Sequence, residues 1–145
     1  MAKPQGRPAE KWIPGFYWRP GMKQAPAMAF VSACPKPVQD ALLSTYQAVL
    51  ERPPNKFPTG TLLWRPMRGP MQGIYEIRDR HGRQLYRLFC LMDSDATRHG
   101  FAAPVLVMLC GGEKVVNTEM DDDIYEEACG YRDDYLRSNP RALLK

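Results

Sequence analysis

The stretch GIYEIRDRHGRQLYRLFCLM, residues 73–92, predicts a β-hairpin. Apolar and polar side chains alternate over Gly73–Arg80, as they do in a strand with one buried face. The tripeptide His-Gly-Arg at 81–83 supplies a turn, and Gln84–Met92 is a second alternating strand. We therefore expect two neighbouring strands of an antiparallel sheet.

The arginines of this hairpin are expected on one face of the sheet. Arg78 and Arg80 share a side of the first strand with Glu76, whereas Arg87 joins them only if the strands pair in the right register. An exposed ion pair of Glu76 with an arginine would order that side chain and would be worth roughly 0–1 kcal/mol. The alternation leaves two interpretations of Tyr86, which could stack on a nucleobase or lie in the core.

Outward from the hairpin, the chain holds further strand signals. Pro104–Cys110 is a continuous apolar run, which predicts a strand covered on both faces, and Gly111-Gly112 is expected to end it. The polar residues Asp93–Gly100 predict the tip of a hairpin that connects this strand to the previous one. Upstream, a passage rich in turn residues is expected to contain a short strand at Thr61–Trp64.

Two amphipathic helices are predicted on either side of these strands. Val38–Glu51 carries apolar residues at helical spacing, and prolines stand at both of its ends. The second helix is expected to begin at the acidic residues Asp121–Asp123, with Thr118 as its cap, and to run to about Leu136. Because a helix start accounts for the acidic cluster, we do not interpret it as a metal site.

These elements predict an α+β fold. It consists of a small antiparallel (mixed) β-sheet with the N-terminal and C-terminal helices packed on one face and the arginines on the free face. Residues 38–137 would form the domain, and 138–145 a C-terminal tail. Residues 1–37, rich in proline and aromatic side chains, would form an irregular arm that packs across the domain or docks a partner.

Charge and composition narrow the function classes. The chain has 145 residues and a formal net charge of +4, and six arginines stand against Glu76 and Asp79 within residues 65–87. This local excess favours a polyanionic partner, although an ordinary solvated face would have the same composition. No apolar run reaches the roughly 18 residues of a membrane span, and nothing at the N-terminus resembles a signal peptide, so we expect a cytoplasmic protein without a membrane partner. The four cysteines and two histidines lack metal-ligand spacing, and no metal or other cofactor is expected.

Three segments in order resemble the phage-derived, HigB-like branch of the RelE/ParE toxin superfamily. They are the Gly-Ile-Tyr-Glu-Ile-Arg sequence at 73–78, the Tyr-Arg-Leu-Phe sequence at 86–89 and the apolar strand that ends in Leu-Cys-Gly-Gly-Glu-Lys at 109–114. A helix with an alanine and tyrosine stripe follows, as it does in that family. The resemblance covers about Val38 to Leu136 and implies a RelE-like fold.

The resemblance implies the toxin of a toxin–antitoxin pair that promotes endonucleolytic cleavage of messenger RNA on the ribosome, with a cognate antitoxin as partner. Arg78, Arg87 and Lys114 match the basic positions of the family motifs and would stabilise the charge at phosphorus. His81 is the candidate acid or base because its reference pKa is near 6.5. The residues expected to bind RNA are Arg68, Arg80, Arg83 and Tyr86.

Three departures from the family pattern leave alternatives open. Cys110 stands at the family's histidine position, Gly112 at its phenylalanine position and Val115 at its second lysine position. The rival hypothesis is therefore a catalytically degraded member that binds nucleic acid or a protein target such as DNA gyrase, on which the ParE branch acts. A third hypothesis is that the chain is an interaction module, which docks a partner through its N-terminal arm. The oligomeric state is not predicted.

Overall fold

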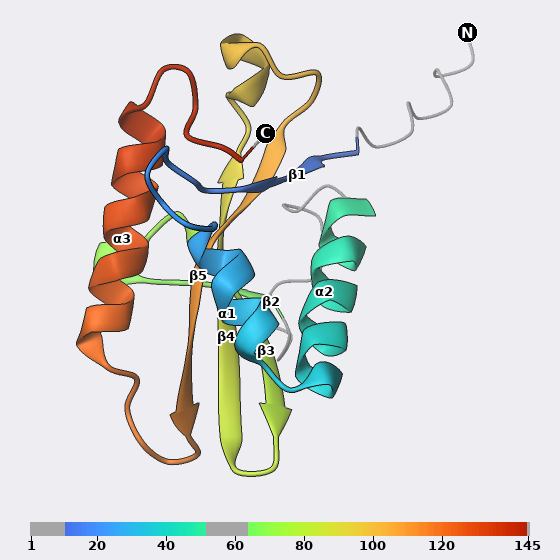
Figure 1. The fold of residues 1–145 in the computed structure, drawn as a ribbon, viewed down its shortest axis with the longest axis vertical. Helices are drawn as coiled ribbons and strands as arrows, with labels where there is room; N and C mark the ends of the chain where they lie inside the picture. The colour runs from blue at the N-terminus through green and yellow to red at the C-terminus, as the bar shows by residue number, and fades with distance from the viewer. Residues whose placement is uncertain (1–10, 52–63, 145) are drawn as a thin grey trace, which may run out of the picture.

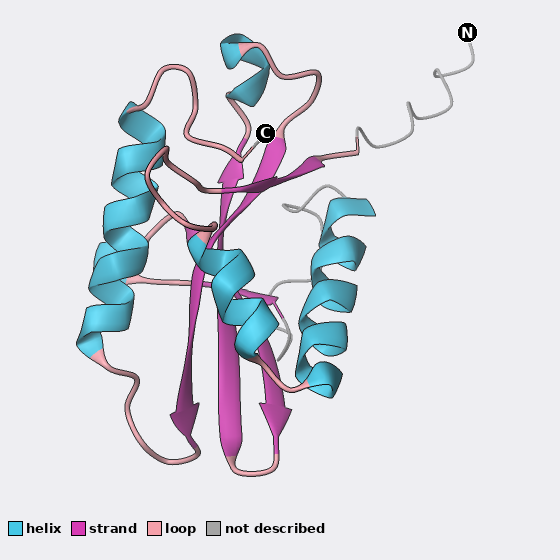
Figure 2. Cartoon of the chain, in the orientation of Figure 1, coloured by secondary structure: helices cyan, strands magenta, loops and turns pink. Residues whose placement is uncertain are grey.

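The computed structural model describes residues 11–51 and 64–144 and contains a five-stranded mixed sheet with three α-helices, which confirms the α+β class (Figures 1 and 2). The strand order is β1-β5-β4-β3-β2, in which β1 is parallel to β5 and the other pairs are antiparallel. Two short 3₁₀ helices, η2 and η3, lie in the connections. The elements are β1 (Ile13–Phe16), α1 (Pro26–Ala33), α2 (Lys36–Glu51), β2 (Trp64–Pro66), η2 (Gly69–Met71), β3 (Ile74–His81), β4 (Gln84–Asp93), η3 (Ala96–His99), β5 (Val105–Val115) and α3 (Asp122–Arg137).

The helices cover both faces of the sheet, so the expectation that they pack on one face is wrong. Helices α1 and α2 pack over one face, and α3 packs over the other (Figure 1). The physical reason lies in β4 and β5, whose side chains are apolar on both sides. Leu88 and Cys90 of β4 join the cluster under α1 and α2, whereas Phe89 and Leu91 join the cluster under α3. A sheet with two apolar faces needs a cover on each of them.

The first part of the chain is regular, contrary to the irregular arm expected for residues 1–37. Within the described residues of that stretch, β1 pairs with β5 and α1 packs on the sheet with Ala27 and Val31 buried. The prolines do not prevent this, because Pro26 occupies the first turn of α1 and Pro14 lies in β1, an edge strand. Residues 1–10 lie outside the described residues.

Several boundaries differ from the predicted ones. The hairpin and both long helices are confirmed, but β5 continues through Gly111-Gly112 to Val115. Asp121 rather than Thr118 caps α3, because its carboxylate accepts from the backbone N–H of Asp123. Of the short strand expected at 61–64, only Trp64 lies within the described residues, and it begins β2. None of the described helices is both long and apolar enough to cross a membrane.

Candidate nucleic-acid interface

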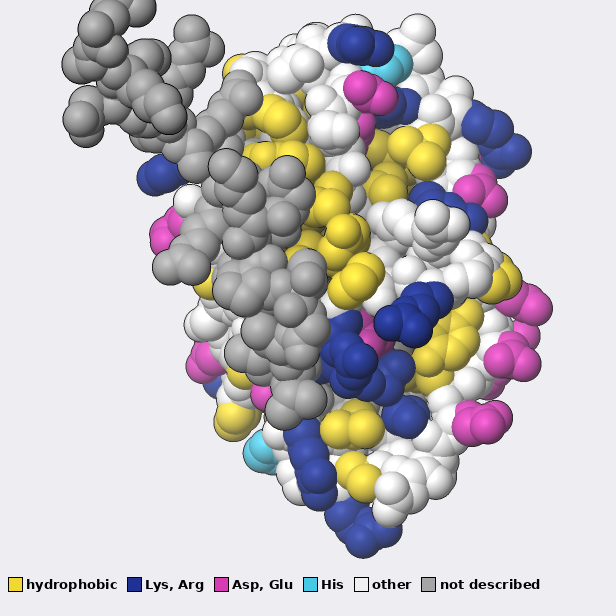
Figure 3. All heavy atoms as spheres, turned by 180° about the vertical axis from the view of Figure 1, so that it is seen from behind, with side chains coloured by type: hydrophobic (Ala, Val, Ile, Leu, Met, Phe, Trp, Pro, Cys, Tyr) yellow, Lys and Arg dark blue, Asp and Glu magenta, His cyan; other side chains and the backbone are white. Residues whose placement is uncertain are grey.

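The register of β3 and β4 brings the predicted arginines together. Arg78 lies directly opposite Arg87, and Arg80 lies opposite Leu85, two residues from Arg87, so all three arginines share a face. This is the face that α3 covers in part, as shown by the hydrogen bond that Arg87 Nη1 donates to the Tyr125 hydroxyl of α3 at 3.2 Å. Figure 3 shows Lys and Arg side chains gathered over the lower half of this face. The strands therefore pair in the register that puts Arg87 on the same face as Arg78 and Arg80.

The buried carboxylate of Glu76 forms ion pairs with both Arg78 and Arg87. Its side chain is 5% exposed, and its carboxylate forms ion pairs with Arg78 Nε at 3.0 Å and with Arg87 Nη1 at 3.4 Å. A carboxylate at this depth is costly unless cations neutralise it, so losing its arginine partners would cost more than losing a partner of the exposed pair expected from sequence. Glu76 Oε2 and Arg87 Nε are both buried, and neither has a hydrogen-bond partner among the residues that the structure describes. The hydrogen-bonding capacity of these charged groups is therefore only partly used within the described structure.

Arg65 of β2 adds a third cation that the sequence had not singled out. It is exposed and is the cross-strand partner of Glu76, so it stands on the same face beside Arg78. Burial lowers the pKa of the Arg78 guanidinium, Glu76 opposes this shift, and the charges of Arg87 and Arg65 lower the pKa further. An arginine remains protonated in spite of such shifts. We call Arg65, Arg78 and Arg87, with the buried Glu76, the arginine cluster.

Tyr125 is a second residue that sequence reasoning missed. It follows Ile124, packs partly buried against the cluster under α3, and its ring meets that of Phe89 edge-on at 5.9 Å. The signal that could have identified it is its place next to Ile124, since a tyrosine at the edge of a helix's apolar stripe can pack its ring on the core and keep its hydroxyl at the surface. Its hydroxyl, in contact with Arg87, is the proton-bearing group that the structure places against the arginine cluster.

The other predicted cations surround the arginine cluster less closely. Lys114 of β5 lies opposite Leu85 on the same face, but its ammonium donates to the carbonyl of Thr118 at 2.6 Å. Arg80 donates through Nε to the carbonyl of Gly82 at 2.9 Å, at the exposed turn. Arg68 and Arg83 are exposed; Arg68 precedes η2, and Arg83 lies in the β3–β4 turn. These side chains extend the positive surface without contacting Glu76.

Two predicted site residues lie away from the arginine cluster. Tyr86 is 6% exposed and belongs to the cluster under α1 and α2, on the opposite face, so of its two interpretations the structure favours the core residue over a residue that stacks on RNA. Its burial raises the pKa of its hydroxyl. His81 is exposed at the end of β3, and strand alternation puts it in phase with Ile77 rather than with Arg78. The structure therefore does not bring a histidine to the arginines.

The three residues that depart from the family motif have different surroundings in the structure. Cys110 is 2% exposed beneath α3, and burial raises the pKa of its thiol, so this cysteine does not replace a histidine as an acid or base. Gly112 lies against α3, where an added Cβ would come within 2.6 Å of Ile124 Cγ2. Val115 is 41% exposed at the end of β5 and adds no charge there.

A groove of about 690 Å³ adjoins the arginine cluster between the η2 segment and α3. Arg68 and Tyr125 both line it, Met67 and Met71 contribute apolar surface, and α3 adds acidic side chains. In Figure 3 acidic side chains lie along the edge of this face, beside hydrophobic ones and next to the basic group. Within the described residues, no group of three or more His, Cys, Asp or Glu could hold a metal ion.

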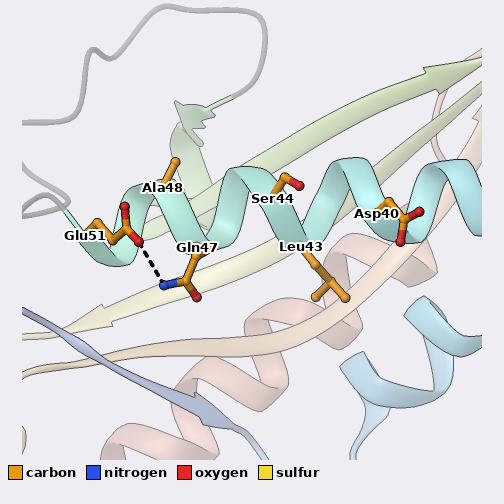
Figure 4. Close-up of a pocket in the computed structure, with 6 residues that line it drawn as sticks. All are labelled: Asp40, Leu43, Ser44, Gln47, Ala48 and Glu51. Atoms are coloured by element: carbon orange, nitrogen blue, oxygen red, sulfur yellow. Dashed lines mark hydrogen bonds between the residues drawn. The ribbon is translucent and has the colours of Figure 1, made fainter.

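A depression on α2 offers less chemistry (Figure 4). All six of its lining residues come from this one helix, so no second element of the described chain lines it. The amide of Gln47 donates to Glu51 at 3.4 Å, and Leu43 is 40% exposed. The depression carries no cation and no buried polar group, and the groove beside the arginines is the better candidate for a ligand site.

Comparisons with known proteins found no family model, no curated protein and no solved structure that matches the chain. The resemblance to the RelE/ParE superfamily therefore rests on the three motifs. Apart from Gly73, which precedes β3, their residues lie on the neighbouring strands β3, β4 and β5.

Proposed function

We propose that this chain binds RNA through the arginine cluster. The observation that carries the proposal is the direct cross-strand pairing of Arg78 with Arg87, with Arg65 beside them. Like charges opposite each other destabilise a sheet, and one buried carboxylate compensates only part of this repulsion. A phosphate group placed over the arginine cluster would neutralise the remaining charge and accept hydrogen bonds from the guanidinium groups.

The motifs support a more specific role, that of the toxin of a toxin–antitoxin pair acting on ribosome-bound messenger RNA. The two motif arginines, Arg78 and Arg87, form the centre of the arginine cluster, and Lys114 lies on the same face. In cleavage the 2′-hydroxyl would attack the adjacent phosphorus, lose its proton to solvent and displace the 5′-oxygen. The arginines would stabilise the charge at phosphorus, and the Tyr125 hydroxyl would protonate the leaving 5′-oxygen and regain its proton from solvent. A cognate antitoxin with acidic residues would match this surface.

The binding-only alternative keeps the same surface without the reaction, with nucleic acid or a protein such as DNA gyrase as its target. The observation that favours this alternative is the absence of a histidine beside the arginines within the part of the chain that the structure describes. RNA binding belongs to both hypotheses, and cleavage belongs to one.

RNA binding is tested by the salt dependence of affinity for a labelled single-stranded 20-mer. Arg65→Ala is the informative variant because Arg65 is exposed and its loss leaves both ion pairs of Glu76 intact. We expect weaker binding and a salt slope reduced by about 0.7, the value for one phosphate contact on a single strand. Arg98→Ala is the matched control, since this exposed arginine lies in η3, beyond the opposite end of β4. Equal effects of the two substitutions would contradict the proposed surface.

The toxin role is tested by induced expression with mapping of messenger RNA ends. Wild-type chain is compared with Arg65→Ala/Arg78→Ala, after circular dichroism has shown that the variant is folded. Growth arrest with new ribosome-dependent cuts, both lost in the variant, would support the nuclease. Arrest without cuts would favour a protein target such as gyrase, and the absence of arrest in soluble wild-type protein would exclude the toxin role.

A further inference from the structure

The groove beside the arginine cluster is formed by a second stripe of α3. Residues 122, 125, 126, 129, 130 and 133 line it and recur at helical spacing. It borders the stripe that packs on the sheet, to which Ala128 and Tyr135 belong, because Tyr125 and Cys129 also pack partly buried against that cluster. The opposite wall is the η2 segment with Met67 and Met71. The groove thus lies between two elements that are held in place by the core.

The groove and the arginine cluster meet at Tyr125. This side chain lines the groove, while its hydroxyl accepts the hydrogen bond from Arg87. Cys129 lies one helical turn further along α3, about 6 Å in axial rise. A nucleotide whose phosphate sits on the arginine cluster therefore has its base within reach of the groove as far as Cys129.

The groove's chemistry differs from that of a phosphate site. Its floor includes Met71 and Cys129, whose sulfur atoms are 3.2 Å apart, and sulfur-rich apolar surface suits a flat aromatic ring. Asp122 and Glu126 are exposed on its α3 rim, where they repel phosphate and accept hydrogen bonds. Adenine, cytosine and guanine carry exocyclic amino donors that a carboxylate accepts, whereas uracil presents two carbonyl acceptors and one N–H.

We propose that this groove binds the base next to the phosphate held by the arginine cluster, and that it prefers an amino-bearing base to uracil. This inference rests on the proposed RNA binding. The base would lie on the Met71 and Cys129 surface beside Tyr125, with its amino group donating to Glu126 or Asp122. One charge-assisted hydrogen bond corresponds to a preference of about tenfold.

Cys129 provides the measurement, because the other three cysteines are buried. The rate of its alkylation by N-ethylmaleimide is followed in the full chain without RNA and with saturating 12-mers of adenylate, cytidylate or uridylate. We expect the adenylate and cytidylate 12-mers to slow alkylation about fivefold or more, since the thiol reacts only from the unoccupied fraction, and the uridylate 12-mer to slow it little. Equal protection by all three 12-mers would overturn the base preference.

Glu126→Gln is the matching variant. It should reduce the adenylate-over-uridylate preference in affinity while leaving uridylate affinity nearly unchanged. Glu127→Gln, the same change at an exposed neighbour that does not line the groove, should keep the preference. If RNA binding depends on Arg65 but does not protect Cys129 from alkylation, the groove is not a base site, and the proposed RNA binding stands. Absence of RNA binding would refute the proposed function, and protection by a cationic peptide but not by RNA would make the groove a peptide site.

Discussion

At the scale of single residues, Glu76 decides how the arginines are held. Replacing it with alanine would leave Arg87, whose side chain is 11% exposed, without its buried counter-ion. We expect Glu76→Ala to lower the free energy of unfolding by roughly 3 kcal/mol, as measured by urea denaturation. Asp40→Ala breaks the exposed pair with Lys36 and should cost no more than about 0.5 kcal/mol. Similar losses in the two variants would show that Glu76 has no special structural role.

A residue of the site could be predicted where its position depends on its own strand, and could not where it depends on contacts with residues far away in the sequence. Strand alternation placed Glu76, Arg78 and Arg80 on one face, because side-chain direction depends only on position along the strand. The burial of Glu76 depends on its neighbours in β2 and β4, and the contact of Arg87 with Tyr125 joins residues 38 apart. Nothing local in the sequence fixes such contacts, which is why Arg65 and Tyr125 were missed.

At the scale of elements, the glycine pair of β5 determines how closely the helices approach the sheet. A Cβ at Gly111 would collide with Phe30 of α1, and a Cβ at Gly112 would collide with Ile124 of α3, on the other face. From sequence, the pair was expected to end the strand because glycine weakens strands. In the structure the missing side chains instead make room for helices on both faces, so β5 continues. That consequence could not be predicted before the helices were placed.

Gly112→Ala should therefore destabilise the chain through overpacking. We expect a loss of about 1–3 kcal/mol in the free energy of unfolding, since the new Cβ would come within 2.6 Å of Ile124 Cγ2. Ile124→Ala in the same chain should make the glycine substitution less costly than it is alone, a coupling that a double-mutant cycle measures. Gly130→Ala is the control, because no atom lies within 4 Å of its added Cβ, and it should stabilise α3 by about 1 kcal/mol. Additive effects of the Gly112 and Ile124 substitutions would exclude the collision.

At the scale of the whole molecule, polar contacts tie the beginning of the described chain to its end. The Tyr17 hydroxyl donates to Asp134 of α3 at 2.6 Å, and Arg19 forms an ion pair with the same carboxylate at 2.7 Å. Tyr17 also forms a β-bridge with Leu143. The segment after β1 is thus fixed to α3 and to the C-terminal residues. This explains how a proline-rich N-terminal region, expected to be an arm, becomes part of the folded unit.

Asp134 makes this connection dependent on pH. Hydrogen bonds from Arg19 and Tyr17 lower the pKa of Asp134 from 3.8 to about 2. Since the unfolded chain binds this proton more readily, the contribution of Asp134 to stability is present above pH 3.8 and is lost as the pH falls through about 2. Urea unfolding from pH 2 to 7 should therefore give a difference between wild type and Asp134→Asn that grows between pH 2 and 4 and is constant above. Asp133→Asn changes an exposed carboxylate that is paired with the adjacent Arg132. It should leave the change in the free energy of unfolding between pH 2 and 4 as it is in wild type. A constant difference between wild type and Asp134→Asn over the whole pH range would show that the Asp134 carboxylate does not couple α3 to the N-terminal segment.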